Sequence, residues 1–125
     1  MSGKHKKQFG IWMDTHHATI VGREHVDSGD FVVLAHEENP GYTRTSNEHA
    51  KMNADITLMH KFFKVITTHM QNAEEVHVTG TGQVQEEFIH HLADTAQFKH
   101  VVAYDSTTNK MSDEKLIEFM TEKFN

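Results

Sequence analysis

The first third of the chain alternates short apolar runs with polar turns. Three apolar runs, residues 8–13, 18–22 and 31–35, are separated by polar residues at 14–17 and 27–30. Two strands joined by a short polar turn are typical of a β-hairpin. The pattern therefore predicts a three-stranded antiparallel meander, with residues 9–13 as a central strand of the sheet.

From about residue 54 the apolar period changes from two to about 3.6 residues. Residues 54–70 and 83–97 space their apolar side chains three or four positions apart, which predicts two amphipathic helices. Ser112 precedes two acids, Asp113 and Glu114, and this is typical of the capped first turn of a last helix. Residues 75–79 and 98–104 predict short strands between these helices.

The expected order of elements is β-β-β-α-β-α-β-α. Strands that alternate with helices pair in parallel through right-handed crossovers, whereas the meander is antiparallel. The sequence therefore predicts an α/β protein with a five-stranded mixed sheet, helices on both faces and the ribonuclease-H-like order. We expect one domain over residues 1–125, with residues 1–7 as a flexible basic arm and residues 37–53 as a long polar loop.

Composition narrows the functional classes. The formal net charge is −6 with histidine neutral, which argues against nucleic-acid binding over the whole surface. The chain has no cysteine and no apolar run of membrane-spanning length, so we expect a cytoplasmic protein without membrane contact. Twelve histidines make the surface charge sensitive to acid below about pH 6.

A nuclease would need several carboxylates around two metal ions roughly 4 Å apart. Asp14 follows the first strand, but Thr79 and Gly80 stand where a second carboxylate is needed. We therefore expect no bound metal, no cofactor and no metal-dependent cleavage, with Asp14 accepting backbone hydrogen bonds in an Asx turn. His16 and His17 are adjacent in that turn and are not placed to share one ion.

Residues Gly80, Thr81, Gly82 and Gln83, here called the 80–83 turn, join the fourth strand to the second helix. Backbone N–H groups and the dipole at a helix N-terminus favour an anion. Position 85, where a dinucleotide motif has its third glycine, is Gln85, and a phosphate-loop lysine is absent. Two interpretations stay open: a tight structural turn, or a contact for phosphate or the RNA backbone.

Residues 11–21 (IWMDTHHATIV) resemble the opening of small bacterial proteins related to the archaeal and eukaryotic peptide-chain release factor and Pelota family. Residues 77–82 (HVTGTG), 104–106 and 110–113 resemble that family's later strand, Gly-x-Gly and final-helix elements. The resemblance covers nearly the whole chain. It implies the ribonuclease-H-like middle domain of these multi-domain factors, known as a translational machinery component. Thr81 interrupts the Gly-Gly-Gln tripeptide of true release factors, and Gln85 stands where related small proteins often carry a basic residue.

Our first functional hypothesis is a non-enzymatic, translation-factor-like module that contacts the ribosome, RNA or a protein partner. The contact would use the 80–83 turn and the loop at 39–53, which carries Arg44 and Lys51, with Asp14, His16 and His17 as secondary candidates. One alternative is a degenerate ribonuclease-H-like hydrolase that uses Asp14 with a divalent metal. Another is a stress-linked homo-oligomer whose histidines respond to acid.

Overall fold

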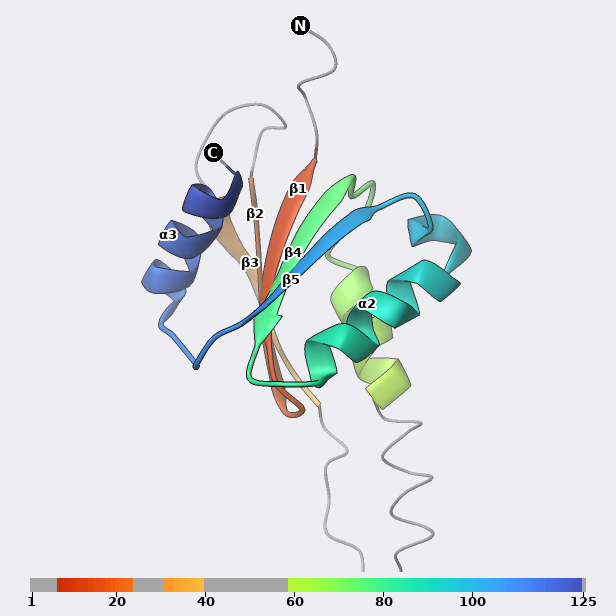
Figure 1. The fold of residues 1–125 in the computed structure, drawn as a ribbon, viewed down its shortest axis with the longest axis horizontal. Coiled ribbons are helices and arrows are strands. Elements are labelled where there is room, and N and C mark those ends of the chain that lie inside the picture. The colour runs from red at the N-terminus through yellow and green to blue at the C-terminus, as the bar shows by residue number, and fades with distance from the viewer. Residues whose placement is uncertain (1–6, 24–30, 40–58, 125) are drawn as a thin grey trace, which may run out of the picture.

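The computed structural model describes residues 7–23, 31–39 and 59–124. Residues 59–67 are helical, and Figure 1 shows how the remaining elements surround one twisted sheet. In chain order these elements are β1 (Gln8–Met13), β2 (His17–Arg23), β3 (Phe31–Glu38), β4 (Glu75–Gly80), α2 (Val84–Asp94), the 3₁₀ turn η2 (Ala96–Phe98), β5 (Val102–Thr107) and α3 (Asp113–Phe124).

The five strands form one mixed sheet in the order β3-β2-β1-β4-β5. β2 is antiparallel to β1 and β3, while β4 is parallel to β1 and β5. Ile11 at the centre of β1 faces Ile20 on one neighbour and Val78 on the other. The prediction of a mixed sheet with residues 9–13 at its centre is confirmed.

Helices cover both faces of this sheet (Figure 1). Phe9, Ile11 and Met13 pack with residues of α2 and of the helical segment 59–67 in one apolar cluster. Trp12 belongs to a second cluster with residues of α3. Because β1 is buried between two layers, its side chains are apolar on both sides rather than alternating with polar ones.

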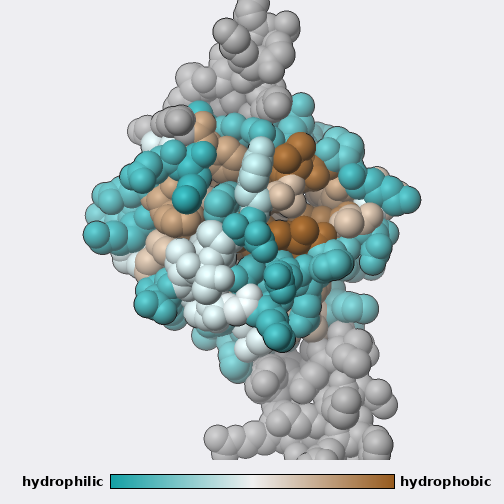
Figure 2. Space-filling view, viewed as in Figure 1, coloured by the Kyte–Doolittle hydropathy of each residue, from teal (hydrophilic) through white to brown (hydrophobic). Residues whose placement is uncertain are grey.

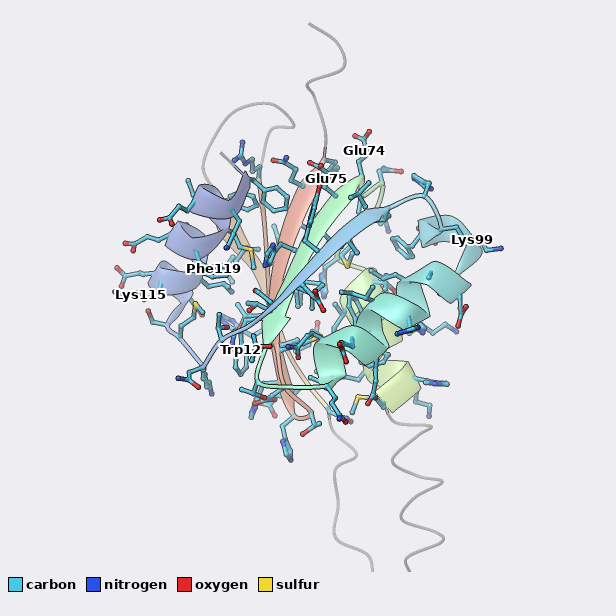
Figure 3. All side chains as sticks on the ribbon, in the orientation of Figure 1. Trp12, Glu74, Glu75, Lys99, Lys115 and Phe119 are labelled. Atoms are coloured by element: carbon cyan, nitrogen blue, oxygen red, sulfur yellow. The ribbon has the colours of Figure 1, made fainter. Side chains whose placement is uncertain are left out.

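Gly10 sets how closely α3 approaches the sheet. A Cβ atom at this position would collide with the side chain of Met120 on α3. Figure 3 shows Phe119 pointing from α3 toward the sheet and Trp12 near the carboxyl end of β1. Met120 of α3 is therefore seated over Gly10, the position of β1 that has no side chain.

The predicted start of the long polar loop is wrong, and strand pairing explains the difference. β3 continues to Glu38, because Glu37 and Glu38 pair with Ala18 and His17 of β2, so these residues are not part of the loop predicted at 37–53. Residues 40–53 of that loop, including Arg44 and Lys51, lie outside the described residues, as do residues 1–6 of the predicted arm and residues 54–58 of the predicted helix.

The predicted helix at 54–70 ends at residue 67 in the structure. The hydroxyls of Thr67 and Thr68 donate to the carbonyl oxygens of Lys64 and Val65, three residues back. The backbone N–H groups of residues 69 and 70 also donate three residues back, and that of Thr68 is shared between Lys64 and Val65. Asn72 then adopts a left-handed conformation with φ of 64°. Met70 fits the apolar spacing of the predicted helix, but its side chain is buried from the turn that follows the helix.

The strand predicted at 98–104 begins four residues late. Phe98 lies in η2 and is buried against the core, and β5 starts at Val102, which pairs with Glu75. A short apolar run does not by itself distinguish a buried 3₁₀ turn from a strand.

The surface in Figure 2 is largely hydrophilic, with apolar side chains gathered where β5 and α2 lie side by side. Partly buried residues of this region, Ile89, Val101 and Ala103, pack against the core. Among the helices of the described chain, none is long and apolar enough to cross a membrane.

Candidate functional site

The carboxyl ends of the three parallel strands meet at one edge of the sheet. Met13 ends β1 beside Gly80 at the end of β4, and Gly80 pairs with Thr107 at the end of β5. The backbone N–H of Thr108 donates to the Gly80 carbonyl oxygen at 2.8 Å. Ligands of open α/β sheets bind outside this kind of edge. The structure thus brings the Asp14 turn, the 80–83 turn and the end of β5 to one edge.

The two glycines of the 80–83 turn have different roles. A Cβ atom on Gly80 would collide with the carbonyl oxygen of Met13, so the close approach of β4 to β1 requires glycine there. A Cβ on Gly82 would meet no atom within 4 Å. Thr81, Gly82 and Gln83 are all exposed, so this part of the turn has room for a side chain or a ligand.

Gln85 holds the turn in place from beneath. Its side chain is buried, with 2% exposure. The Oε1 atom accepts the N–H of Gly82 at 3.3 Å, while Nε2 donates to the carbonyl oxygens of Ser106 at 3.0 Å and Gly80 at 3.4 Å. One side-chain amide therefore ties β4, β5 and the start of α2 together.

A chain of hydroxyl groups runs under the same edge. Ser106 Oγ donates to Thr79 Oγ1 at 2.8 Å, and Thr79 Oγ1 lies 2.9 Å from Thr108 Oγ1. Thr79 is fully buried, so its hydroxyl needs these partners. The network fastens the end of β4 to the end of β5, on the face of the sheet that carries α3.

His77 continues this network away from the edge. Its ring stacks on Tyr104 and meets Phe119 of α3 edge-on, with ring centroids 6.3 Å and 5.5 Å away. Burial lowers the pKa of His77 below its ordinary value, and the charge of Lys123 adds to this effect while Asp105 opposes it. Burial therefore favours the neutral form of this imidazole.

The carboxylate of Asp14 is engaged by its own turn. Its Oδ1 accepts the backbone N–H groups of His16 at 2.8 Å and His17 at 2.7 Å, which confirms the predicted Asx turn. His16 and His17 are exposed, and their ring centroids lie 6.2 Å apart. Across residues 7–23, 31–39 and 59–124, no three His, Asp or Glu side chains are grouped closely enough to hold a metal ion.

Sequence reasoning missed Gln85, His77 and the hydroxyl network as parts of this edge. The signal for Gln85 is a polar residue three positions before Phe88, on the apolar side of the predicted helix. For Thr79 and Ser106 the signal is weaker, because both lie on short strands whose register with each other depends on tertiary pairing.

No known protein family and no curated protein matches the chain in sequence. Several solved structures are similar to it in fold, among them two Pelota proteins and a translation termination factor. Pelota from Archaeoglobus fulgidus has a TM-score of 0.63 at 11% identity, over 95% of this chain and 32% of that one. Pelota from Thermoplasma acidophilum gives 0.60 at 14% identity, over 97% and 34%. The archaeal translation termination factor aRF1 gives 0.53 at 14% identity, over 94% and 34%.

At this identity the likeness concerns the fold. It agrees with the ribonuclease-H-like order expected from the sequence, with its five-stranded mixed sheet and helices on both faces. The chain spans about a third of the length of each of these three proteins. It therefore shares a ribonuclease-H-like fold with one part of the Pelota and aRF1 chains.

Proposed function

We propose that the chain is a non-enzymatic, translation-factor-like module that contacts the ribosome through RNA at the 80–83 turn. The observation that carries this proposal is the fold shared with Pelota and with aRF1, a translation termination factor. The expected resemblance of residues 11–21 and 77–82 to the same group of proteins supports it from the sequence.

The form of the turn supports a docking contact rather than catalysis. The residues Thr81, Gly82 and Gln83 are exposed at the N-terminal end of α2, where backbone N–H groups and the helix dipole favour a phosphate oxygen. Gln85 fixes the conformation of this turn, so a partner meets a preformed surface. Asp14, the residue expected to bind metal in the hydrolase alternative, already accepts two backbone N–H groups.

Ribosome co-sedimentation at low and physiological salt tests this function. Gly82→Glu places a carboxylate in the open space above the turn, so we expect it to reduce co-sedimentation at least about tenfold. Gln97→Glu adds the same charge at an exposed position of η2 and serves as the matched control. Binding by the parent should weaken as salt rises, because phosphate contacts release counterions.

A Gly82→Glu protein that is folded and co-sediments as well as the parent would contradict the proposed contact. Folding is checked by circular dichroism on both variants. Equal loss in Gly82→Glu and Gln97→Glu would also contradict it, because the effect would then follow net charge rather than position.

A further inference from the structure

A cavity of about 690 Å³ lies between the helical residues 59–67 and α2. Both elements cover the face of the sheet opposite α3, so this cavity is separate from the His77 side of the sheet. The residues that line the cavity include Met59, His60, Phe63, Glu87, His91 and Asp94. Its volume falls in the range of clefts that hold a ligand or an anchoring side chain, about 300–1,000 Å³.

The wall of the cavity is apolar and aromatic. Phe63 meets Phe88 edge-on with ring centroids 5.3 Å apart, and the His91 ring lies 5.5 Å from Phe63. His91 also stacks on Phe88 at 6.4 Å. Met59, Phe63 and His91 line the cavity, with the fully buried Phe88 packed behind them, and this wall suits an apolar side chain.

Burial disfavours a positive charge on His91 in this wall. Burial lowers its pKa, and the nearby His60 and Lys64 act in the same direction, while Asp94 opposes them. His60 stands across the cavity, with its ring centroid 6.2 Å from that of His91. Both rings contribute polar atoms to the cavity wall.

The rim of the cavity on α2 is acidic. Glu87 lies four residues before His91 and Asp94 three residues after it, so both share the helix face of His91. Neither carboxylate forms an ion pair with any residue of the described ranges, Lys64 included. α2 has three acidic residues and neither lysine nor arginine along its whole length.

We propose that this cavity binds a basic segment of a protein partner. An apolar side chain of the segment enters between Met59 and Phe63, while its Lys or Arg side chains pair with Glu87 and Asp94. An amphipathic helix laid along a helix-lined groove is one established form of such recognition. RNA is the less suitable occupant of this cavity, because its phosphates would face Glu87 and Asp94 at the rim. This surface and partner go beyond the function proposed above and do not depend on it.

Fluorescence anisotropy with a defined probe tests the proposal. The probe is a fluorescein-labelled amphipathic helical peptide of leucine and lysine, and its comparison peptide replaces every leucine with alanine. We expect the leucine peptide to bind the full chain at least about tenfold more tightly, because the cavity requires an apolar anchor. Equal affinity for the two peptides would overturn the proposal, and so would tighter binding of an oligouridine of similar length.

A pair of adjacent variants tests the position of binding. Glu87→Lys reverses the charge at the cavity, and we expect it to raise the Kd of the leucine peptide at least about tenfold. Glu86→Lys makes the same change one residue away, on an exposed side chain that does not line the cavity, and should raise it less than about threefold. Both variants lose a first-turn acid of α2, so their effects on folding match.

Equal weakening in the two variants would overturn the proposal, because net charge would then explain the binding. The peptide titration and ribosome co-sedimentation address different surfaces, so either result stands when the other fails.

Discussion

The Nε2 atom of His77 lies 2.8 Å from the hydroxyl oxygen of Ser106, across the pair formed by β4 and β5. The Ser106 hydroxyl in turn donates to Thr79, so it accepts from the imidazole, and His77 carries its proton on Nε2. A neutral, oriented imidazole is thus part of the contact between the sheet and Phe119 of α3.

This arrangement makes stability depend on pH. The pKa of His77 is lowered in the folded state, whereas the unfolded chain binds the proton at the ordinary value of about 6.5. As pH falls through 6.5, the unfolded state gains protons first, so the free energy of unfolding decreases below that pH. We expect urea midpoints to fall between pH 7 and pH 5.

His77→Gln removes the titrating group and retains a hydrogen-bond donor toward Ser106. We expect a smaller decrease of the urea midpoint with falling pH in this variant than in the parent. His90→Gln makes the same substitution at an exposed position of α2 and is the matched control for the loss of a histidine. Equal slopes for His77→Gln and the parent would contradict the assignment.

Gln85→Ala should destabilise the protein by about 2–3 kcal/mol. Removing the buried amide takes away the acceptor of the Gly82 N–H and one donor from each of the carbonyl oxygens of Gly80 and Ser106, which keep the Thr108 N–H and the Thr79 hydroxyl. Gln83→Ala, at the exposed neighbour, should change the free energy of unfolding by less than about 0.5 kcal/mol. Urea denaturation of both variants measures the difference, and a loss in Gln85→Ala as small as in Gln83→Ala would show that the amide is dispensable.

The two glycines of the 80–83 turn should respond differently to alanine. Gly80→Ala forces a Cβ against the Met13 carbonyl, and we expect a loss of about 2 kcal/mol or more because β1 and β4 must separate. Gly82→Ala enters open space and should leave the melting temperature nearly unchanged. Thermal unfolding followed by circular dichroism compares them. A Gly80→Ala protein as stable as Gly82→Ala would be inconsistent with the close approach of the two strands.

We expect Asp14 to stabilise its turn and to have no part in nucleic-acid cleavage. Asp14→Ala removes the acceptor of two backbone N–H groups and should cost about 1–2 kcal/mol, with a smaller cost for Asp14→Asn, whose amide oxygen still accepts. We expect the parent to show no Mg²⁺- or Mn²⁺-dependent cleavage of RNA or DNA. Cleavage that is present in the parent and lost in Asp14→Asn would restore the hydrolase alternative.

Local sequence patterns correctly predicted the elements that are determined by residues close together in the chain. The apolar runs of β1 and β2 around the Asp14 turn gave the hairpin, and Ser112 with Asp113 marked the start of α3, where the N–H of Lys115 donates to the Ser112 hydroxyl. Parallel order along the second half of the sheet followed from the alternation of helix and strand.

The features that local sequence patterns did not predict depend on contacts between residues far apart in the chain. The start of β5 depends on the pairing of Val102 with Glu75, 27 positions earlier in the chain. Phe98 lies before this pairing begins, and its side chain is buried from η2. Gln85 has its role only because Ser106 lies beneath α2, and no spacing along the chain shows that contact. At the 80–83 turn, the sequence marked both glycines but did not distinguish the one that is sterically required.

The central place of β1 also bears on how the protein folds. Its antiparallel neighbour β2 follows within a short turn, but its parallel neighbour β4 comes much later in the chain, with Gln8 and Glu75 joined by a 2.7 Å hydrogen bond across 67 positions. Closing such a contact costs chain entropy before any burial compensates for it. We therefore expect a high contact order, and folding in about milliseconds to seconds, which is slow for a small domain. The docking of β4 beside β1 should be the rate-limiting step.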